Sequence, residues 1–367
     1  MKLMKTPRSV DLSITNRCNL RCTYCSHFTG AGDVGQDLHK EEWLQFFDEL
    51  NRCAVMTVTI SGGEPFCRKD LRELVEGIVE NRMRFNILSN GTLIDDEVAA
   101  FLASTGRCDG VQVSIDGSVP TTHDACRGEG NFLKGMQGIK SLLNHNVPVS
   151  VRVTIHKENV WDLENVARLL LEEVGLPSFS TNAASYMGLC RQNADQVQLT
   201  VEERSLAMDT LLKLKEKYNG RISASAGPLA EGIKWLEMEK VLQEGMDPIS
   251  KGGYLIGCNG PISKLAVRAD GVMVPCSQMG HIELGRINMD NLQEVWQEHP
   301  ELKRLRERHK IALSDFEFCQ GCDYIPYCTG NCPALAYTIL GIENHPSPDA
   351  CLKRFLEAGG RLPEGIG

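Results

Sequence analysis

The chain has 367 residues and a formal net charge of −9, and 42% of its residues are hydrophobic. This length and composition indicate a globular protein of two domains, or of one large domain with an extension. The acidic balance argues against a general nucleic-acid binder, which would carry a basic surface patch. The sequence contains no run of 18 apolar residues that would predict a membrane span, and its N-terminus lacks the apolar segment of a signal peptide. We therefore expect a cytoplasmic protein.

The first 180 residues alternate β-branched or apolar runs with amphipathic helical segments. This rhythm predicts a parallel α/β sheet with right-handed crossover helices. Six units are too few for a complete eight-stranded barrel, so we expect an open, partial (β/α)6 barrel. The predicted strands are Ser9–Thr15, Val55–Ile60, Arg84–Ser89, Gly110–Ile115, Pro148–Ile155 and Ser178–Thr181. The predicted helices between them are His39–Arg52, Lys69–Asn81, Asp95–Thr105, Phe132–His145 and Val160–Val174.

Cysteine is unusually frequent, with 15 residues in a chain that lacks an export signal. In a reducing cytosol, such a content indicates metal binding or redox work rather than disulfides. Three cysteines lie near the N-terminus and seven lie in the last 110 residues. The other five are Cys53, Cys67, Cys108, Cys126 and Cys190. For most of these five we expect burial as small hydrophobic side chains.

Directly after the first predicted strand, Cys18, Cys22 and Cys25 form a C-x3-C-x2-C motif. Three thiolates leave one iron of a four-iron cluster without a protein ligand and open to a small molecule, whereas a cluster held by four cysteines can only pass electrons. Because His27 follows closely, a structural Cys3His zinc site is an alternative interpretation of this motif.

Three further motifs each follow a predicted strand. The segment Ser61–Pro65 reads S-G-G-E-P, in which the glycines permit close backbone approach and the proline stiffens the exit. The third strand ends in Ser89-Asn90-Gly91. The fourth ends in Ser114-Ile115-Asp116-Gly117 and continues to His123 and Arg127. Taken alone, each motif could be an ordinary surface turn, but active sites gather at this end of parallel strands.

Together these motifs resemble the radical S-adenosylmethionine (SAM) superfamily from about Ser9 onward. The resemblance implies that the three N-terminal cysteines hold a [4Fe–4S] cluster whose open iron binds the amino and carboxylate groups of SAM. It also implies that the G-G-E-P segment holds the amino group, that Ser114 and Asp116 approach the ribose, and that Arg127 pairs with the carboxylate. The SAM-contacting residues implied in this way are Tyr24, Gly62, Gly63, Glu64, Pro65, Ser89, Asn90, Ser114, Asp116 and Arg127.

The seven C-terminal cysteines resemble, spacing by spacing, the SPASM extension of radical SAM enzymes. Such extensions carry two auxiliary [4Fe–4S] clusters, which would make three clusters in this chain. By that resemblance the first auxiliary cluster is held by Cys258, Cys276 and Cys332, and the second by Cys319, Cys322, Cys328 and Cys351. Seven ligands leave one position of the first cluster open or filled from elsewhere, with Cys126 and Cys190 as the plausible thiols. A pair of zinc ribbons would satisfy the spacing alone.

Residues between these two regions have a strongly helical pattern, with helices expected at Glu202–Tyr218 and Leu229–Gln243. Short helices are expected at Leu292–Trp296 and Glu301–Arg308. The predicted organisation is a radical SAM partial barrel over residues 1–199, a helical bridge over 200–252 and a SPASM domain over 253–367.

The resemblance implies that the enzyme reductively cleaves SAM to a 5′-deoxyadenosyl radical, which removes a hydrogen atom from a substrate. SPASM proteins act mostly on peptides, so the expected function is a maturase that installs a crosslink, an epimerisation or a backbone rearrangement in a ribosomally made peptide. The layout is similar to that of maturases for leader peptides of the nif11 class, some of which excise a tyramine unit. Tyr186, Cys190 and Cys126 are the candidate catalytic residues.

Three alternatives remain. Sulfatase-maturating relatives carry a carboxylate directly after the second SPASM cysteine, where this chain has Ser277. A cofactor-precursor maturase acting on a peptide or a tetrapyrrole is a second alternative, and a non-enzymatic iron–sulfur electron carrier is a third.

The expected partners follow from this interpretation. Because the first strand begins near residue 9, we expect a separate protein to recognise the leader of the precursor peptide. We also expect an external electron donor such as flavodoxin or ferredoxin, and neither nucleic acid nor membrane as a partner.

Overall fold

The computed structural model describes residues 3–28, 36–245, 252–256 and 260–363. Cys258, an expected ligand of the first auxiliary cluster, lies outside these residues. In the described part of the chain, the helices are too short or too polar to cross a membrane.

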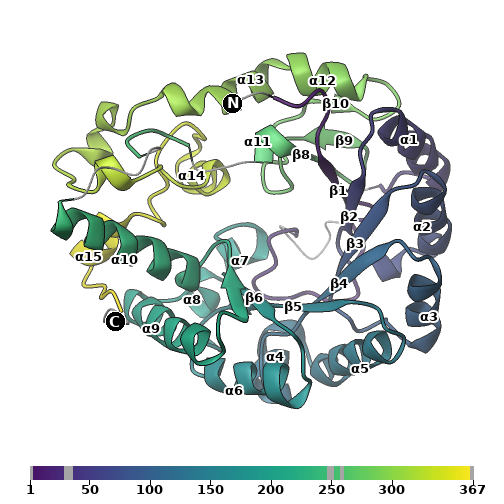
Figure 1. Cartoon of the computed structure of the whole chain (residues 1–367), viewed down its shortest axis with the longest axis horizontal. Helices are drawn as coiled ribbons and strands as arrows, with labels where there is room; N and C mark the ends of the chain where they lie inside the picture. The colour runs from purple at the N-terminus through teal and green to yellow at the C-terminus, as the bar shows by residue number, and fades with distance from the viewer. Residues whose placement is uncertain (1–2, 29–35, 246–251, 257–259, 364–367) are drawn as a thin grey trace.

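One curved sheet forms the centre of the molecule (Figure 1). Among the described residues its strand order is β10-β9-β8-β1-β2-β3-β4-β5-β6-β7. The strands from β8 through β7 are all parallel, whereas β9 and β10 are antiparallel to their neighbours. The strands are β1 (Ser9–Ser13), β2 (Thr57–Ser61), β3 (Arg84–Ser89), β4 (Cys108–Ser114), β5 (Val149–Ile155), β6 (Phe179–Ala183), β7 (Ile222–Ala224), β8 (Lys264–Val267), β9 (Val272–Val274) and β10 (Gly285–Arg286).

Helices cover the outer side of this sheet, and the central space lies on its inner side (Figure 1). The helices are α1 (Lys40–Arg52), α2 (Leu71–Glu80), α3 (Asp96–Ser104), α4 (Pro120–Arg127), α5 (Asn131–Asn144), α6 (Leu163–Arg168), α7 (Gly188–Gln192), α8 (Ala194–Val197), α9 (Val201–Lys217), α10 (Pro228–Glu244), α11 (Gly260–Ser263), α12 (Leu292–Glu298), α13 (Pro300–Arg306), α14 (Pro333–Leu340) and α15 (Leu352–Glu357).

The predicted partial barrel is confirmed, with all six strands and the crossover helices in place. Three differences have local causes. The helix expected over Val160–Val174 is shorter, because α6 passes into a π-helical turn at Leu169–Glu173. The unpredicted helix α4 begins with Pro120 in its first turn and ends at Gly128, whose φ is +92°. The short strands β7 to β10 extend the sheet on both sides of the six predicted strands.

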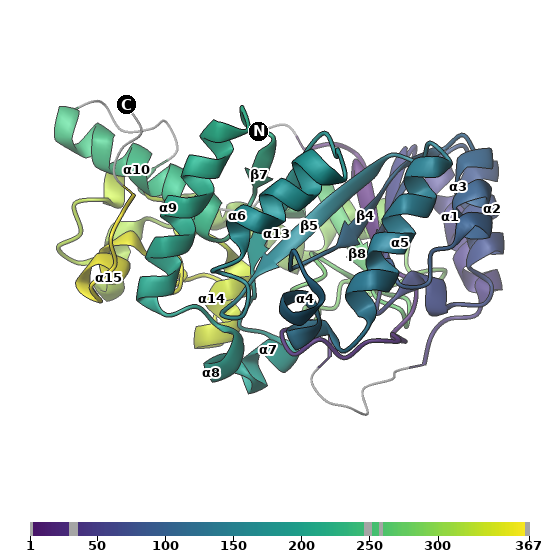
Figure 2. The ribbon, with the colours of Figure 1, turned by 90° about the horizontal axis from the view of Figure 1, so that it is seen from below.

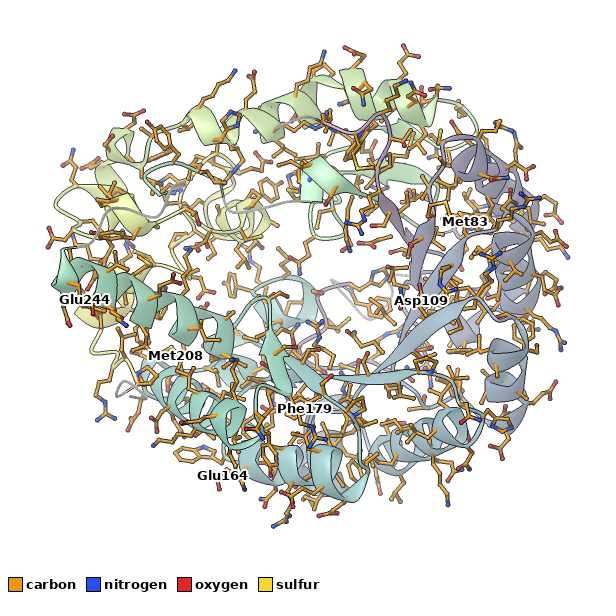
Figure 3. All side chains as sticks on the ribbon, viewed as in Figure 1. Met83, Asp109, Glu164, Phe179, Met208 and Glu244 are labelled. Atoms are coloured by element: carbon orange, nitrogen blue, oxygen red, sulfur yellow. The ribbon has the colours of Figure 1, made fainter. Side chains whose placement is uncertain are left out.

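The two faces of the sheet differ in polarity because side chains alternate along each strand. In β5, Val149, Val151 and Val153 are buried under the helices, whereas Ser150 and Arg152 are exposed or half-buried on the opposite face. Parallel strands that are covered on both faces would instead read as continuous apolar runs. The inner face is therefore built for contact with a polar ligand or water, and Figure 3 shows Asp109 on that side.

The C-terminal part of the chain is continuous with the barrel. Strand β8 pairs with β1 in parallel register, so that Ser9 lies opposite Lys264. The indole nitrogen of Trp296, in α12, donates to the backbone oxygen of Met4 at 3.0 Å. On the other flank, α9 and α10 pack together, and Trp235 of α10 contacts Phe355 of α15 with ring centroids 4.9 Å apart. Figure 2 shows α9, α10 and α15 gathered at one end of the molecule.

The alternation in β2 gives a direct test of the two faces. Ile60 is fully buried in the main core, and its neighbour Thr59 borders a cavity on the inner face. We expect Ile60→Ala to lower the free energy of unfolding by about 2–5 kcal/mol, because it removes buried methyl groups and leaves a cavity. Thr59→Ala should cost less than about 1 kcal/mol. Anaerobic denaturant unfolding followed by circular dichroism measures both, and equal losses would contradict the polarity of the inner face.

Candidate active site

The loop that carries Cys18, Cys22 and Cys25 follows β1 and is tied to the G-G-E-P turn after β2. The backbone N–H of Gly63 donates to Thr15 O at 2.8 Å, and that of Glu64 donates to Arg17 O at 2.7 Å. A Cβ atom at Gly63 would lie 2.3 Å from Arg17 O. The glycine is therefore required by this close contact, which fixes the start of the cysteine loop.

The carboxylate of Glu64 points into the protein and links β2 to β3. It is fully buried and accepts hydrogen bonds from the Ser89 hydroxyl at 2.9 Å and from the Asn90 backbone N–H at 2.7 Å. Burial raises the pKa of Glu64 to about 7. The hydrogen bonds from Ser89 and Asn90 favour the ionised carboxylate, so this residue orients the G-G-E-P turn from behind the cavity.

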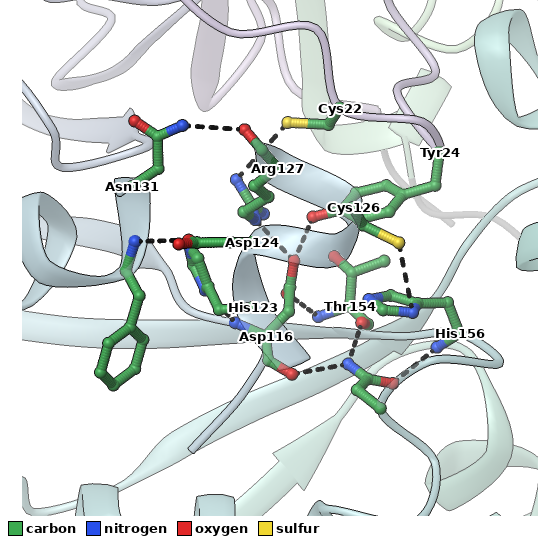
Figure 4. A network of polar contacts seen from close by, with 12 residues as sticks. Cys22, Tyr24, Asp116, His123, Asp124, Cys126, Arg127, Asn131, Thr154 and His156 are labelled. Carbon is green, nitrogen blue, oxygen red and sulfur yellow. Dashed lines mark hydrogen bonds and ion pairs between the residues drawn. The ribbon is translucent and has the colours of Figure 1, made fainter. Parts of the chain in front are cut away.

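A buried ion pair holds the other side of the cysteine loop (Figure 4). Asp116, which follows β4, accepts from Nε of Arg127 at 2.5 Å, from the Tyr24 hydroxyl and from the Thr154 backbone N–H at 2.8 Å. Burial raises the pKa of the Asp116 carboxyl, but the Arg127 guanidinium outweighs this effect, so that the net pKa is lowered. Because Asp116 is ionised in this pairing, it fixes Arg127 of α4 and Tyr24 of the cysteine loop in one arrangement.

Two neutral histidines support this ion pair. Burial lowers the pKa of His123 to about 4, and its Nδ1 accepts from the Asp116 backbone N–H at 3.1 Å. His156 stacks on the Tyr24 ring, with centroids 5.4 Å apart, and its pKa is likewise lowered to about 4 by burial. His123 therefore belongs to the support of the site and lies four residues before Arg127 on α4.

Helix α7 and its neighbour α8 cover the cysteine loop after β6. The backbone N–H of Leu189 donates to Cys25 O at 2.8 Å, and the Asn193 side chain donates to Thr23 O at 2.9 Å. Gly188 has a φ of +55°, and a Cβ atom there would lie 2.6 Å from Cys25 O. This glycine permits the close packing of α7 on the loop, a contact that the sequence analysis missed.

These elements enclose a cavity of about 330 Å³ at the C-terminal ends of the strands. Most of the residues that the sequence predicted to bind SAM or its own cluster border it: Cys18, Cys22, Cys25, Tyr24, Gly62, Gly63, Ser89, Asn90, Ser114 and Arg127. Glu64, Pro65 and Asp116 do not border it. Asp116 hydrogen-bonds to Arg127, Tyr24 and the backbone of Thr154, so that it orients Arg127 and Tyr24. Its expected approach to the ribose of SAM stays a prediction.

The three candidate catalytic residues also lie away from this cavity. Cys126 and Cys190 are buried, and they form an apolar cluster with Tyr24 and Val197 behind the cysteine loop. Burial raises the pKa of both thiols to about 11. Tyr186 lies beside Ser185, which borders the cavity, and its backbone oxygen accepts from the Thr338 hydroxyl. The assignment of a catalytic role to any of these three residues stays a prediction.

A second cavity, of about 570 Å³, occupies the inner side of the sheet. It is lined by the alternate polar residues of the strands and by Ser277, which follows Cys276. The two cavities share the lining residues Ser61, Leu88, Gln112, Arg152 and Asn182. They therefore form one polar lumen that leads from the cysteine loop into the barrel. Arg152, Gln112 and Asn182 were not singled out from the sequence, although the alternating pattern of β5 points Arg152 inward.

Four of the C-terminal cysteines surround a small pocket of their own. Cys319, Cys322, Cys328 and Cys351 line it together, as expected for the ligands of the second auxiliary cluster. Within the described ranges, no three His, Cys, Asp or Glu side chains converge tightly enough to bind a single metal ion. Cys276 and Cys332 both pack against the main core, and Cys258 is outside the described residues, so the first auxiliary set stays a prediction. The other scattered cysteines, Cys53, Cys67 and Cys108, are half-buried rather than fully buried.

Comparisons with known proteins agree with this site. Residues 12–170 match the family model described as the radical SAM superfamily, and residues 258–323 match the SPASM iron–sulfur cluster-binding domain. The chain is 30% identical over 342 residues to Fe-coproporphyrin III synthase from Methanosarcina barkeri, covering 90% of this chain and 84% of that protein. It is 24% identical over 360 residues to PqqA peptide cyclase from Granulibacter bethesdensis, covering 96% and 89% of the two chains.

A solved structure has the same fold. Streptococcus suis SuiB bound to its precursor peptide SuiA superposes with a TM-score of 0.71 at 14% identity, covering 95% of this chain and 77% of that chain. The chain belongs to the radical SAM superfamily and carries a SPASM domain. It is an enzyme whose cofactors are SAM and iron–sulfur clusters, the first of them a [4Fe–4S] cluster in the radical SAM domain.

The residues around the first cavity are suited to these cofactors. Three thiols from one loop share the cavity with the Gly62–Gly63 backbone and with Arg127, which supplies a guanidinium group. Burial raises the pKa of Cys18 and Cys22 to about 11, so iron is needed to hold them as thiolates.

The ion pair of Asp116 should be essential to this arrangement. We expect Asp116→Asn to lower the free energy of unfolding by about 3–5 kcal/mol, because it leaves the buried guanidinium of Arg127 without a counter-charge. Asp109→Asn is the control, since Asp109 and Arg84 form a partly exposed pair that contributes less than about 1 kcal/mol. Chemical denaturation of both variants measures the difference, and similar losses would show that the buried pair has no special weight.

Replacing Cys18, Cys22 and Cys25 together by Ala should abolish SAM cleavage. If the chain holds three four-iron clusters, the variant should lose about a third of its iron. Cys67→Ala is a matched control. The half-buried Sγ of Cys67 lies 3.9 Å from Oδ1 of Asn19 in the cysteine loop, but Cys67 is not part of the three-cysteine motif. Iron analysis and chromatography of 5′-deoxyadenosine give the answer. A triple variant that still cleaves SAM would refute the site.

Proposed function

We propose that this enzyme modifies a ribosomally made peptide by hydrogen-atom abstraction. The observation that carries the proposal is the second cavity, of about 570 Å³, which joins the cofactor cavity in one polar lumen. An open channel lined by amide, hydroxyl and charged groups suits an extended polar chain, because such groups can pair with backbone N–H and C=O groups. The relatives named for peptide substrates, PqqA peptide cyclase and SuiB with its precursor peptide SuiA, support the same class of substrate.

In this proposal the chain's own residues position the reactants. When bound, SAM and its cluster supply a 5′-deoxyadenosyl radical that takes a hydrogen atom from the substrate. Arg127, fixed by Asp116, would hold the carboxylate of SAM, and Glu64 would orient the turn that faces its amino group. Ser89 and Asn90 complete this binding wall, and the buried Pro65 stiffens the turn behind it. Helices α7 and α8 shield the cysteine loop from water.

The remaining parts of the proposal concern organisation. The expected division into residues 1–199, 200–252 and 253–367 is consistent with the two matched family models, which lie in the first and third of these ranges. The described four-cysteine pocket supports one auxiliary cluster, and Cys258, Cys276 and Cys332 would hold the other. We expect a leader-recognition protein and a flavodoxin or ferredoxin as partners. In its most specific form, the proposal is that the substrate is a precursor peptide of the nif11 class and that the reaction excises a tyramine unit from it.

A second candidate function is the modification of a tetrapyrrole. It is favoured by the 30% identity to Fe-coproporphyrin III synthase. Sulfatase maturation is less favoured, because neutral Ser277 lines the lumen at the position where such relatives carry a carboxylate.

Reconstituted holoenzyme with SAM and dithionite tests the proposal. The enzyme is incubated either with short precursor peptides encoded next to its gene, uniformly deuterated at carbon, or with Fe-coproporphyrin III. We expect deuterium to appear in 5′-deoxyadenosine and the mass of one peptide to change. Unchanged peptides together with a converted tetrapyrrole would contradict the proposal and favour the second candidate.

A further inference from the structure

Arg152 lies on the wall where the two cavities of the lumen meet. It belongs to β5, opposite Ser114 of β4, and it borders both cavities. Its NH2 group donates to the side-chain oxygen of Gln112 at 3.1 Å. Its Nε atom is buried and has no hydrogen-bond partner among the residues that the structure describes. The guanidinium is therefore held in place from one side while part of its donor capacity is unused.

Each of the other charged side chains that border the lumen lies within 4 Å of an oppositely charged group, although Oδ1 of Asp11 accepts no hydrogen bond from the described residues. Lys264 lies 3.8 Å from the carboxylate of Asp11. Asp109 lies 2.5 Å from Arg84, and Arg127 is paired with Asp116. Among the Arg and Lys residues that line the two cavities in the described ranges, Arg152 alone has no acidic partner. Burial lowers the pKa of Arg152, and no carboxylate counteracts this effect.

Asn182 adds an unused acceptor on the same wall. It belongs to β6, which pairs with β5, and it lies opposite Thr154, two residues beyond Arg152. Asn182 borders both cavities, and no residue in the described part of the chain donates to its buried side-chain oxygen. An unpaired cation and an unpaired acceptor in a cavity wall are costly to stability, and such costs concentrate at binding sites.

We propose that Arg152 binds a carboxylate of the substrate, while Asn182 accepts a hydrogen bond from a nearby substrate N–H group. A guanidinium binds a carboxylate in a fixed two-point geometry, so this contact would set the register of the substrate in the lumen. An aspartate or glutamate side chain, or a peptide C-terminus, supplies the carboxylate, and the peptide backbone supplies the N–H group. The inference rests on the proposed function only in naming a peptide as the source of the carboxylate. A tetrapyrrole also carries carboxylates and could supply this group.

The first experiment separates substrate from cofactor, because SAM also has a carboxylate. The affinity of reconstituted holoenzyme for SAM is measured for the wild type, Arg152→Gln and Arg152→Lys. We expect changes of less than about twofold, since Arg127 is the residue assigned to the cofactor. A loss of about tenfold or more in Arg152→Gln, as expected for a charge-assisted contact, would assign Arg152 to SAM and overturn the inference.

The second experiment detects the carboxylate directly. SAM-saturated holoenzyme is treated with phenylglyoxal, which modifies accessible guanidinium groups, and the modification of Arg152 is followed by peptide mass spectrometry. Two pools of acetylated, amidated hexapeptides are added as probes; they differ only in a central Glu or Gln. The Glu pool should slow modification by about threefold or more relative to the Gln pool, because only Glu offers an anion. Equal rates with the two pools, together with no protection by Fe-coproporphyrin III as a second source of carboxylates, would refute the carboxylate site.

Two further arms make the outcome specific. Lys264→Gln is the matched control, because it removes a lumen cation that already has an acidic partner, and protection of Arg152 by the Glu pool should persist in it. Fe-coproporphyrin III serves as the alternative carboxylate source. Protection by this compound and not by the Glu pool would support the site on Arg152 while contradicting the peptide function. Loss of protection in Lys264→Gln would show that the general charge of the lumen, rather than Arg152, attracts the anion, and would overturn the inference.

Discussion

The buried carboxylate of Asp116 is the interaction on which the site depends. Its two oxygen atoms receive donors from α4, from the cysteine loop and from the backbone of β5. A single ionised group thus connects three segments that are far apart in the sequence. The charge is tolerated in a fully buried position because Arg127 compensates it and hydrogen bonds satisfy both oxygen atoms. With this pair in place, the guanidinium of Arg127 and the ring of Tyr24 are oriented before any ligand arrives, which lowers the entropy cost of binding.

The polar inner face of the sheet is the second constraint. In complete eight-stranded barrels, branched apolar side chains fill the interior, so that no space is left there for a ligand. Here Thr59, Gln112 and Arg152 take those positions, so that the interior remains open to a ligand. For the central strands, the main core consequently lies between the strands and the outer helices, whereas β8 and β9 are buried on both faces. The alternation of side chains along each strand therefore places the stabilising core on the outer face of the sheet and the ligand-accessible lumen on the inner face.

Local patterns in the sequence were sufficient for the barrel strands and for the place of the cysteine loop after β1. The four cysteines of the second auxiliary set line one pocket, and their role as cluster ligands stays a prediction. Hydrophobic periodicity and glycine-containing turns are local signals, and cysteine spacing is strongly specific. The helix α4 was missed because the motif from Asp116 to Arg127 contains glycine and proline, which obscure an eight-residue helix. The role of Asp116 could not be deduced, because it depends on Tyr24 and Thr154, whose proximity is tertiary. Arg152 was visible as an inward position of β5, but only the assembled lumen shows that it lacks an acidic partner.

The pairing of β8 with β1 has a consequence for how the chain is made. When β1 leaves the ribosome it can pair with β2 on one edge, but its other edge must wait for residues near 264. During that interval a parallel strand edge is unprotected, and such edges are sites of unwanted association. The long separation in sequence also favours slow completion of the sheet, because loop-closure entropy opposes the contact. Expression of residues 1–199 alone would leave this edge of β1 permanently unpaired. The cluster-bearing extension therefore also protects the first barrel strand, because its strand β8 covers that edge.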